Sequence, residues 1–256
     1  MSRDSQEPMI RVEDLTTYYG ERRILDRVNL EVKAGETTVI LGGSGTGKST
    51  LLRHLIGLES APASGHIYIK GRDIYAMSED EFNLVRQKIG MAFQGAALFN
   101  SMTIEDNVSL PLRELTNLED STIRIVARMK LEQVGLSGVE KRFPSQLSGG
   151  MKKRAGVARA MAMDPEILLF DEPSAGLDPI TAAGLDQLIL KLKQVFEMTI
   201  VVVTHEMSSA ALIADRVAMM NRWKGRGHRY TGGSSCESRP LGAAVLEPQS
   251  GRRIED

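Results

Sequence analysis

With 256 residues, the chain is long enough for one large domain or for a domain with a subdomain. Its net charge of −1 gives no strong attraction to nucleic acid or to an anionic membrane, and 42% hydrophobic residues suit a soluble globular protein. A single cysteine, Cys236, excludes an internal disulfide bond and a cysteine-based zinc site. The polar N-terminus does not read as a signal peptide, and no run approaches the roughly 18 apolar residues of a membrane span. We therefore expect a protein that does not cross a membrane.

The first part of the chain, residues 9–41, is predicted to form strands and turns. Apolar alternation over 9–12 and 28–32 indicates two strands, and Gly20 and Gly35 supply turns. Two interpretations of Tyr18 and Tyr19 stay open, because they could be plain strand residues or could offer a flat face to an adenine ring.

A glycine-rich loop follows a short buried strand over 37–41 and precedes a helix over 48–56. It fits the phosphate-loop pattern G-x-x-x-x-G-K-[ST] at every fixed position. Its glycines can turn successive N–H groups towards one point, and the helix start adds its positive end. Lys48 can reach the outer phosphates and the Ser49 hydroxyl can ligate Mg²⁺. A chance glycine-rich turn is disfavoured because strand, loop and helix are all present, so we expect this chain to bind a nucleoside triphosphate. The loop consists of Gly42, Gly43, Ser44, Gly45, Thr46, Gly47, Lys48 and Ser49.

Residues 64–94 return to strands around one short helix. A strand is predicted over 66–70, and a helix over 78–85 has Ser78 and Glu81 at capping-box spacing. A further strand over 89–93 ends at Gln94.

From residue 95 to residue 163 the pattern becomes helical. Helices are predicted over 103–115 and 121–134, and the second is expected to present a broad apolar face. Ser148 is a natural N-cap for a third helix that runs to Met163. This segment is interpreted as a helical subdomain inserted into an α/β core. The apolar face consists of Ile123, Val126, Met129 and Val134.

The core then resumes with alternating strands and helices. Strands are predicted over 166–171, 198–204 and 216–220, and a helix that begins at Asp178-Pro179 is predicted to run to about Phe196. This alternation favours a mostly parallel sheet.

Two acidic residues, Asp171 and Glu172, end the apolar strand over 166–171. An aspartate at such a strand end can hold Mg²⁺, and an adjacent glutamate can orient the attacking water or accept its proton. A solvated acidic pair is the alternative, but a phosphate loop in the same chain disfavours it.

A second anion-friendly helix start lies at Leu147-Ser148-Gly149-Gly150-Met151. One chain thus has two phosphate-binding helix starts but one lysine-bearing loop. This suits two copies paired head to tail, each lending its second site to the other's nucleotide. A capped helix with a flexible start is the alternative.

The ordered motifs resemble those of the ATP-binding subunit of an ABC transporter over about residues 9–221. In that comparison Gly42–Ser49 is Walker A, Leu147–Met151 the signature and Ile167–Glu172 Walker B, with Met151 where Gln is commoner. The remaining motifs are the aromatic Tyr19, the Q-loop Gln94, the D-loop Ser174–Asp178 and the switch histidine His205. The resemblance implies an ABC ATPase fold, an α/β P-loop NTPase (RecA-like) core with an antiparallel β subdomain and an inserted α-helical subdomain. The implied ATPase domain covers 9–222, with 9–94 and 163–222 as the core and 95–162 as the helical subdomain.

The same resemblance assigns roles to individual residues. Glu172 would polarise the attacking water, His205 would contact the γ-phosphate and Gln94 would sense metal and water. Asp171 would hold Mg²⁺ together with Ser49 and Gln94. An isolated histidine is more often structural, but the place of His205 after a β-branched strand favours function. The residues expected to bind ATP are Tyr19, the loop Gly42–Ser49, Thr50 and, on the partner copy or at the dimer seam, Ser148, Gly149, Gly150 and Asp178.

Residues 94–103, 107–108, 111–114 and 149–154 are similar to those of Mla/Mce-type lipid transporter ATPases. This implies an ATPase that works with Mg²⁺ and powers a membrane permease that moves phospholipid or another lipid in the bacterial envelope. The implied partners are a second copy, an integral-membrane permease and an Mce-type lipid-binding subunit, without nucleic acid. The implied location is the cytoplasmic face of the inner membrane. Ala97, Leu98, Phe99 and Met102 could form a groove for a permease helix or could be the helical subdomain's own core.

The resemblance stops after Asn221. Residues 223–256 contain the only Trp and the only Cys of the chain, are rich in Gly, Ser and Pro, and are interpreted as a disordered tail. Our hypothesis is that this tail is out of frame, and a genuine divergent tail that binds a partner is the alternative.

Three other classes of function are weighed. A ribosomal or DNA-repair ATPase of this type would carry two cassettes or a long coiled coil, which this chain lacks. An ABC importer or exporter for another solute stays open. A non-hydrolysing binding module is disfavoured by Glu172 and His205.

Overall fold

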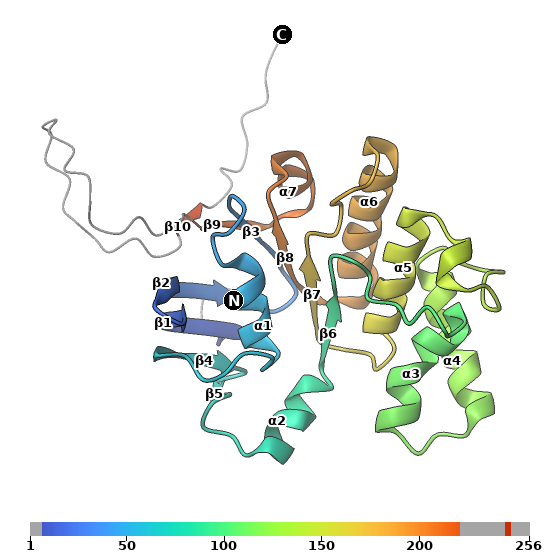
Figure 1. Cartoon of the computed structure of the whole chain (residues 1–256), viewed down its shortest axis with the longest axis horizontal. Helices are drawn as coiled ribbons and strands as arrows, with labels where there is room; N and C mark the ends of the chain where they lie inside the picture. Colours follow the sequence, from blue (N-terminus) through green and yellow to red (C-terminus); the bar gives the residue numbers. More distant parts are fainter. Residues whose placement is uncertain (1–6, 221–243, 247–256) are drawn as a thin grey trace, which may run out of the picture.

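The computed structural model describes residues 7–220 and 244–246, and Figure 1 shows that this part contains two β-sheets with helices around them. The tail predicted over 223–256 lies outside the described residues, apart from the short strand β10 (Ala244–Leu246). Among the described residues, no helix is both long and apolar enough to cross a membrane.

The smaller sheet is antiparallel and has the strand order β2-β1-β4-β5. In register, Val12 lies opposite Leu30 on one side and opposite Ile67 on the other. All three side chains are buried, so this sheet turns one apolar face inward. The predicted antiparallel subdomain is therefore confirmed. Its strands are β1 (Ile10–Tyr19), β2 (Arg22–Val32), β4 (Ser64–Ile69) and β5 (Arg72–Asp73).

The larger sheet has the order β10-β9-β3-β8-β7-β6, and all neighbouring strands from β9 to β6 are parallel. Leu41 pairs with Thr204, and Val203 pairs with Asp171, so β3, β8 and β7 end at the same edge. This edge is where ligands bind in open parallel sheets. The strands are β3 (Thr37–Leu41), β6 (Ile89–Ala92), β7 (Ile167–Asp171), β8 (Thr199–Thr204) and β9 (Arg216–Met219).

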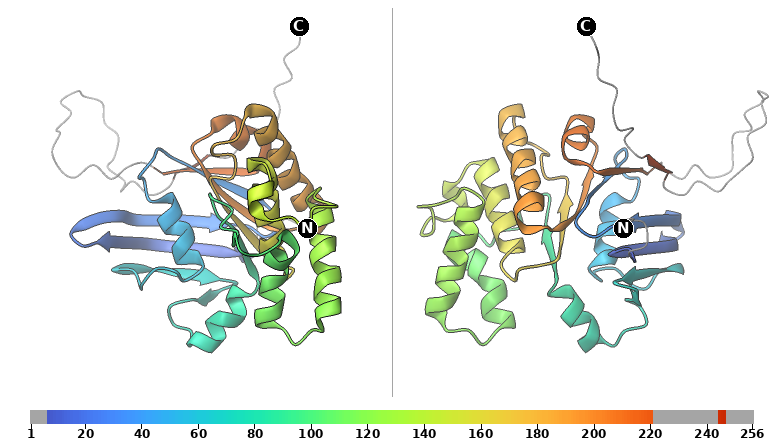
Figure 2. Two further views of the ribbon diagram at one scale, coloured as in Figure 1. Left: turned by 45° about the vertical axis from the view of Figure 1, so that its right-hand side comes forward. Right: turned by 180° about the vertical axis from the view of Figure 1, so that it is seen from behind.

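Both faces of the parallel sheet are buried, because successive side chains of β7 and β8 point to opposite sides. Leu169 and Val201 join the core that includes the antiparallel sheet and α1 (Lys48–Leu55). Phe170 and Val202 join a second core with the remaining large helices. Figure 1 and Figure 2 show α1 on one side of this sheet and the helices of the second core on the other. The helices of the second core are α3 (Ile104–Leu115), α4 (Asp120–Gln133), α5 (Gly149–Ala160), α6 (Pro179–Phe196) and α7 (Met207–Ile213).

The starts of several helices are set by short polar side chains, as the sequence predicts. Ser78 forms the predicted capping box with Glu81 at the start of α2 (Glu79–Arg86), and Ser148 caps α5. Thr103 caps α3 and accepts a hydrogen bond from the backbone of Asp106. A short 3-10 helix, Pro144–Gln146, precedes α5.

Two details of the helical region differ from the prediction. The apolar face predicted for α4 includes Met129, but Met129 is 54% exposed, whereas Ala127 and Leu131 are buried. The buried face of α4 instead runs through positions 123, 127, 131 and 134. This face is turned around the helix axis from the predicted one and excludes Met129. Helix α5 ends at Ala160 rather than Met163. The boundaries of the helical subdomain at residues 95 and 162 stay a prediction.

Candidate nucleotide site

The phosphate loop connects β3 to α1, and its conformation requires glycine. Gly45 and Gly47 have positive φ angles of 76° and 97°. A side chain at position 47 would lie 2.6 Å from Leu25, and one at position 42 would lie 2.5 Å from the backbone oxygen of Met220. The loop therefore packs against both sheets, and substitution at either glycine displaces a neighbour.

The side chain of Lys48 is held inside this loop. It is 6% exposed, and its Nζ donates to the backbone oxygens of Gly42 and Gly43 at 2.8 and 3.2 Å. The same ammonium lies 3.4 Å from Oε1 of Glu172. It thus stands between the loop and the acidic end of β7, where a phosphate would meet it.

Ser49 and Asp171 come together although they are far apart in sequence. The Ser49 Oγ donates to Oδ1 of Asp171 at 2.8 Å. Hydroxyl and carboxylate oxygens are hard ligands of the kind that Mg²⁺ prefers, with phosphate oxygens and waters completing the shell. No group of three or more His, Cys, Asp or Glu suited to a metal occurs in residues 7–220 and 244–246. The hydroxyl of Ser49 and the carboxylate of Asp171 fit Mg²⁺ as two of its oxygen ligands.

The carboxylate of Glu172 and the imidazole of His205 form a second side-chain contact at the site. The carboxylate of Glu172 is 13% exposed, and its Oε2 lies 2.7 Å from Nδ1 of His205. His205 follows β8, so the parallel register brings it beside the end of β7. The structure therefore brings Lys48, Ser49, Asp171, Glu172 and His205 together, and their roles stay predictions.

Lys153 is a further functional candidate, to which the sequence motifs assign no role. It lies on α5 and its Nζ donates to the backbone oxygen of Glu172 at 3.3 Å. Burial lowers the pKa of Lys153, and the nearby carboxylates of Glu172, Asp171 and Glu206 oppose this shift. Lys153 follows Lys152 on the helix, and nothing in this local sequence indicates a contact with a distant backbone oxygen. The contact could therefore not be predicted from the sequence alone.

Gln94 and the residues after it form an irregular segment beyond β6. Gln94 is exposed, and its side chain makes no hydrogen bond within the described part of the chain. Ala96 and Ala97 both have positive φ, and Arg159 of α5 donates to their backbone oxygens at 3.1 and 2.7 Å. Helix α5 thus holds the segment that follows Gln94 in place. The side-chain amide of Gln94 remains available to a ligand.

The two tyrosines expected at the base of the nucleotide lie at the end of β1. Tyr18 is 40% exposed and Tyr19 is 45% exposed. The hydroxyl of Tyr19 donates to Glu59, and Arg23 lies over the ring of Tyr18. Both rings keep accessible surface, so the role of Tyr19 in stacking stays a prediction.

The N-terminus of α5, the second helix start predicted to bind an anion, is capped but lies apart from the phosphate loop. Ser148 caps α5, and a side chain at Gly150 would lie 2.3 Å from Cγ2 of Thr181. Asp178 caps α6, and the hydrogen bond from the Thr181 side chain lowers the pKa of Asp178. Among the described residues, no hydrogen bond or ion pair joins Ser148–Gly150 to the phosphate loop. The two helix starts belong to cores on opposite faces of the sheet.

Two hollows in the described part of the structure are lined by none of the predicted nucleotide ligands. One, of about 350 Å³, is lined by Met91, Phe93, Phe99, Leu110 and Arg159, among others. Phe99 is 50% exposed there and Ala97 is exposed, whereas Leu98 packs against the core. Of the predicted apolar set, Phe99 thus lines the groove and Leu98 packs against the core.

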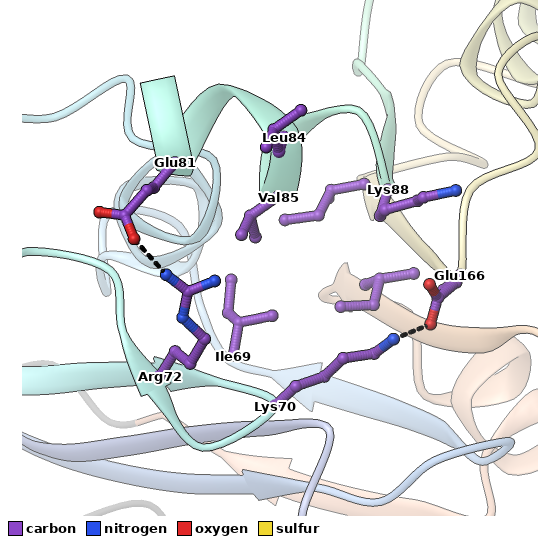
Figure 3. A pocket seen from close by; sticks show the side chains of 10 residues that line it. Ile69, Lys70, Arg72, Glu81, Leu84, Val85, Lys88 and Glu166 are labelled. Atoms are coloured by element: carbon purple, nitrogen blue, oxygen red, sulfur yellow. Dashed lines mark hydrogen bonds and ion pairs between the residues drawn. The ribbon is translucent and has the colours of Figure 1, made fainter. Parts of the chain in front are cut away.

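The other hollow, of about 170 Å³, lies beside α2 and is shown in Figure 3. Its floor is apolar, and Arg72 pairs with Glu81 while Lys70 pairs with Glu166 at its rim (Figure 3). It contains none of the predicted nucleotide ligands.

Comparison with known families agrees with the arrangement of the residues at this site. A family model described as ABC transporter matches residues 25–175. The chain belongs to the ABC transporter family. The ABC ATPase fold predicted from the motifs is supported by solved cassettes. The dimeric structure of the bacterial ABC transporter cassette MJ0796 has a TM-score of 0.76 and 35% identity, and covers 83% of this chain and 94% of that chain. A post-hydrolysis dimer of the same cassette, bound to ADP and Pi, has a TM-score of 0.75 and 33% identity, covering 86% and 100%.

Curated relatives of this ABC family chain carry two different names. The probable ribonucleotide transport ATP-binding protein mkl of Mycobacterium leprae is 46% identical over 222 residues, 86% of this chain and 64% of that protein. The intermembrane phospholipid transport system ATP-binding protein MlaF of Haemophilus influenzae is 45% identical over 207 residues, 81% of this chain and 78% of that protein. The chain thus spans just under two thirds of the mycobacterial relative's length.

Proposed function

We propose that this chain is an ATP-hydrolysing subunit that powers a membrane permease, and that its cargo is phospholipid or another lipid of the bacterial envelope. One observation carries the proposal of hydrolysis. The ends of three adjacent parallel strands bring a phosphate-loop lysine, a hydroxyl–carboxylate pair and a glutamate–histidine pair to one edge of the sheet. These are the groups that phosphoryl transfer to water requires.

The roles follow from the contacts. Lys48 and the loop N–H groups would hold the phosphates of ATP, and Ser49 and Asp171 would hold Mg²⁺, which supplies charge neutralisation. Glu172 would orient the attacking water and accept its proton, while His205 would contact the γ-phosphate. The carboxylate of Glu172 contacts both Lys48 and His205. The γ-phosphate would compete with the Glu172 carboxylate for contacts with Lys48 and His205, and would release the carboxylate for the water.

A second copy would complete the site. The N-terminus of α5 offers backbone N–H groups and the positive end of its dipole to an anion, yet it belongs to the opposite face of the sheet from α1. Two copies in head-to-tail arrangement would place Ser148–Gly150 of each over the ATP of the other. Related cassettes solved as dimers support this arrangement.

The permease would dock at the groove lined by Phe99 and Leu110. This groove lies beside the segment that follows Gln94, and Arg159 links that segment to α5. An apolar groove of this kind suits one face of an amphipathic helix. Contact there would bear on the segment that follows Gln94. In this proposal the chain lies at the cytoplasmic face of the inner membrane, with an Mce-type lipid-binding subunit as a further partner.

The choice of cargo rests on the relatives and on the resemblance around residues 94–114. The MlaF protein of Haemophilus influenzae is named for phospholipid transport, and we transfer this cargo. The mkl relative is named for ribonucleotide transport, which makes another solute the second candidate.

Recovery of the tagged full chain from membranes tests the proposal. We expect a multi-span permease and an Mce-type lipid-binding subunit to co-purify, and the variant Phe99→Ala to recover less of both while binding ATP normally. A different permease would contradict the lipid cargo and leave the ATPase intact. Absence of any membrane protein from preparations that bind ATP would contradict the transport role.

A further inference from the structure

One face of α5 binds two segments of the nucleotide site. Lys153, Gly156 and Arg159 are three residues apart and therefore lie on the same face of the helix. Lys153 donates to the backbone oxygen of Glu172, and Arg159 donates to those of Ala96 and Ala97. Gly156 lets the helix approach Ala96, since an added Cβ would lie 3.2 Å from it. The helix that begins with Ser148–Gly150 is thus fastened to the neighbours of both Glu172 and Gln94.

The backbone of Glu172 depends on this support. Its φ of 47° lies in the left-handed region, which residues other than glycine seldom adopt. Its N–H donates to Val203 at 2.9 Å, and its oxygen accepts from the N–H of Ala175 at 3.2 Å and from Lys153. Among the described residues, Lys153 is the only side chain that bonds to this peptide group. The ammonium therefore helps to fix the direction of the Glu172 carboxylate between Lys48 and His205.

The charge of Lys153 suits this position. Its half-buried ammonium is attracted electrostatically by the carboxylates of Glu172, Asp171 and Glu206. A movement of α5 would carry this cation with it and would shift both the carbonyl and the field around the carboxylate. By contrast, Lys152 on the adjacent face has no side-chain hydrogen bond or ion pair in the described part of the chain.

We propose that Lys153 is a positioning residue that couples the two ATP sites of a head-to-tail dimer. The start of α5 contacts the ATP of the partner copy, and Lys153, on the same rigid helix, sets the catalytic glutamate of its own copy. ATP bound at one site thereby orients the carboxylate at the other. This inference rests on the proposed function, because it requires a dimer in which Ser148–Gly150 meets the partner's nucleotide.

The test compares Lys153→Met with Lys153→Arg and with the matched control Lys152→Met. Each is made in the full chain and purified with the membrane proteins that accompany it. ATP turnover is measured against ATP concentration, and ATP binding is measured separately. We expect Lys153→Met to lower kcat by about tenfold or more and to bring the Hill coefficient from above 1 to near 1, with ATP affinity within about threefold of the parent. Lys153→Arg should restore most of kcat and the Hill coefficient, and Lys152→Met should match the parent.

Several results would overturn the inference. Unchanged kcat and Hill coefficient in Lys153→Met would do so, as would an equal loss in Lys152→Met or a parent Hill coefficient of 1. Parallel loss of ATP binding in Lys153→Met, and in the shorter Lys153→Gln, would assign the lysine to folding alone. A parent protein that neither binds nor hydrolyses ATP would instead contradict the proposed function itself.

Discussion

The Oγ of Ser49 lies 2.8 Å from Oδ1 of Asp171, although 122 residues separate the two in sequence. Ser49 is in the first turn of α1, and Asp171 is the last residue of β7. The contact exists because β8 lies between β3 and β7, and all three strands end at one edge. The fold itself therefore brings these two oxygens together.

The first prediction concerns this pair. Ser49→Ala removes one of the protein oxygens predicted to hold Mg²⁺ and should raise the Mg²⁺ concentration for half-maximal ATP turnover by about tenfold. Removal of divalent cations with a chelator should abolish turnover in the parent. Titration of turnover with Mg²⁺ at saturating ATP measures both effects. An unchanged Mg²⁺ dependence in Ser49→Ala would remove the serine from the metal site.

Glu172→Gln tests the proposed role of the Glu172 carboxylate in ATP hydrolysis. The amide keeps the size of the side chain but cannot accept a proton, so turnover should fall by about 100-fold or more. ATP affinity should be preserved or increased, and a stable ATP-bound dimer should accumulate, which size-exclusion chromatography detects. Turnover close to that of the parent would refute the assigned role.

Local features of the fold were predictable because their causes are local. Ser78, Ser148 and Asp178 cap helices at the positions that the sequence indicates, since a cap needs only a side chain and the next turn of backbone. The phosphate loop and the acidic end of β7 were predicted for the same reason.

Contacts between distant segments were harder to foresee. Met129 belongs to the predicted apolar face of α4, but the packing partners of that helix leave it 54% exposed. Lys153 reaches a backbone oxygen, and a backbone oxygen has no sequence signature. Arg159 is bound to Ala96 and Ala97 in the same way. The groups that bridge α5 to the site were therefore visible only in the structure.

Stability should depend on pH through His54. Its ring is fully buried, with Nε2 2.8 Å from Thr17 Oγ1 and Nδ1 2.6 Å from the Tyr75 hydroxyl. Burial lowers the pKa of His54, and the charge of Glu59 opposes this shift only in part. The unfolded chain therefore binds a proton that the folded protein excludes. The neutral His54 ring therefore contributes fully to the free energy of unfolding above about pH 6.5. As the pH falls below this value, the free energy of unfolding decreases by up to about 1.4 kcal/mol per pH unit.

The measurement is the free energy of unfolding at pH 7.5 and pH 5.5 for the parent and for His54→Gln. The parent should lose more stability than the variant over this interval, because the variant has no imidazole to protonate. Equal losses would show that His54 does not carry the dependence.

A pair of glycine substitutions tests the packing of α5 on the sheet. A Cβ at Gly90 would lie 2.2 Å from the backbone oxygen of Ala160, whereas a Cβ at Gly95 meets nothing within 4 Å. Gly90→Ala should lower the free energy of unfolding by about 1–3 kcal/mol through overpacking. Gly95→Ala should change it by less than about 0.5 kcal/mol. Denaturant unfolding compares them, and equal effects would contradict the close approach of α5 to β6.

The most direct test of the account is titration of the purified chain with ATP in the presence of Mg²⁺, beside the variant Lys48→Ala. We predict saturable binding by the parent and binding weakened by about tenfold or more in the variant, because a buried ammonium that bonds the phosphates is lost. Binding that is absent in the parent, or equally strong without the Lys48 ammonium, would contradict the assignment of the phosphate loop as the nucleotide site.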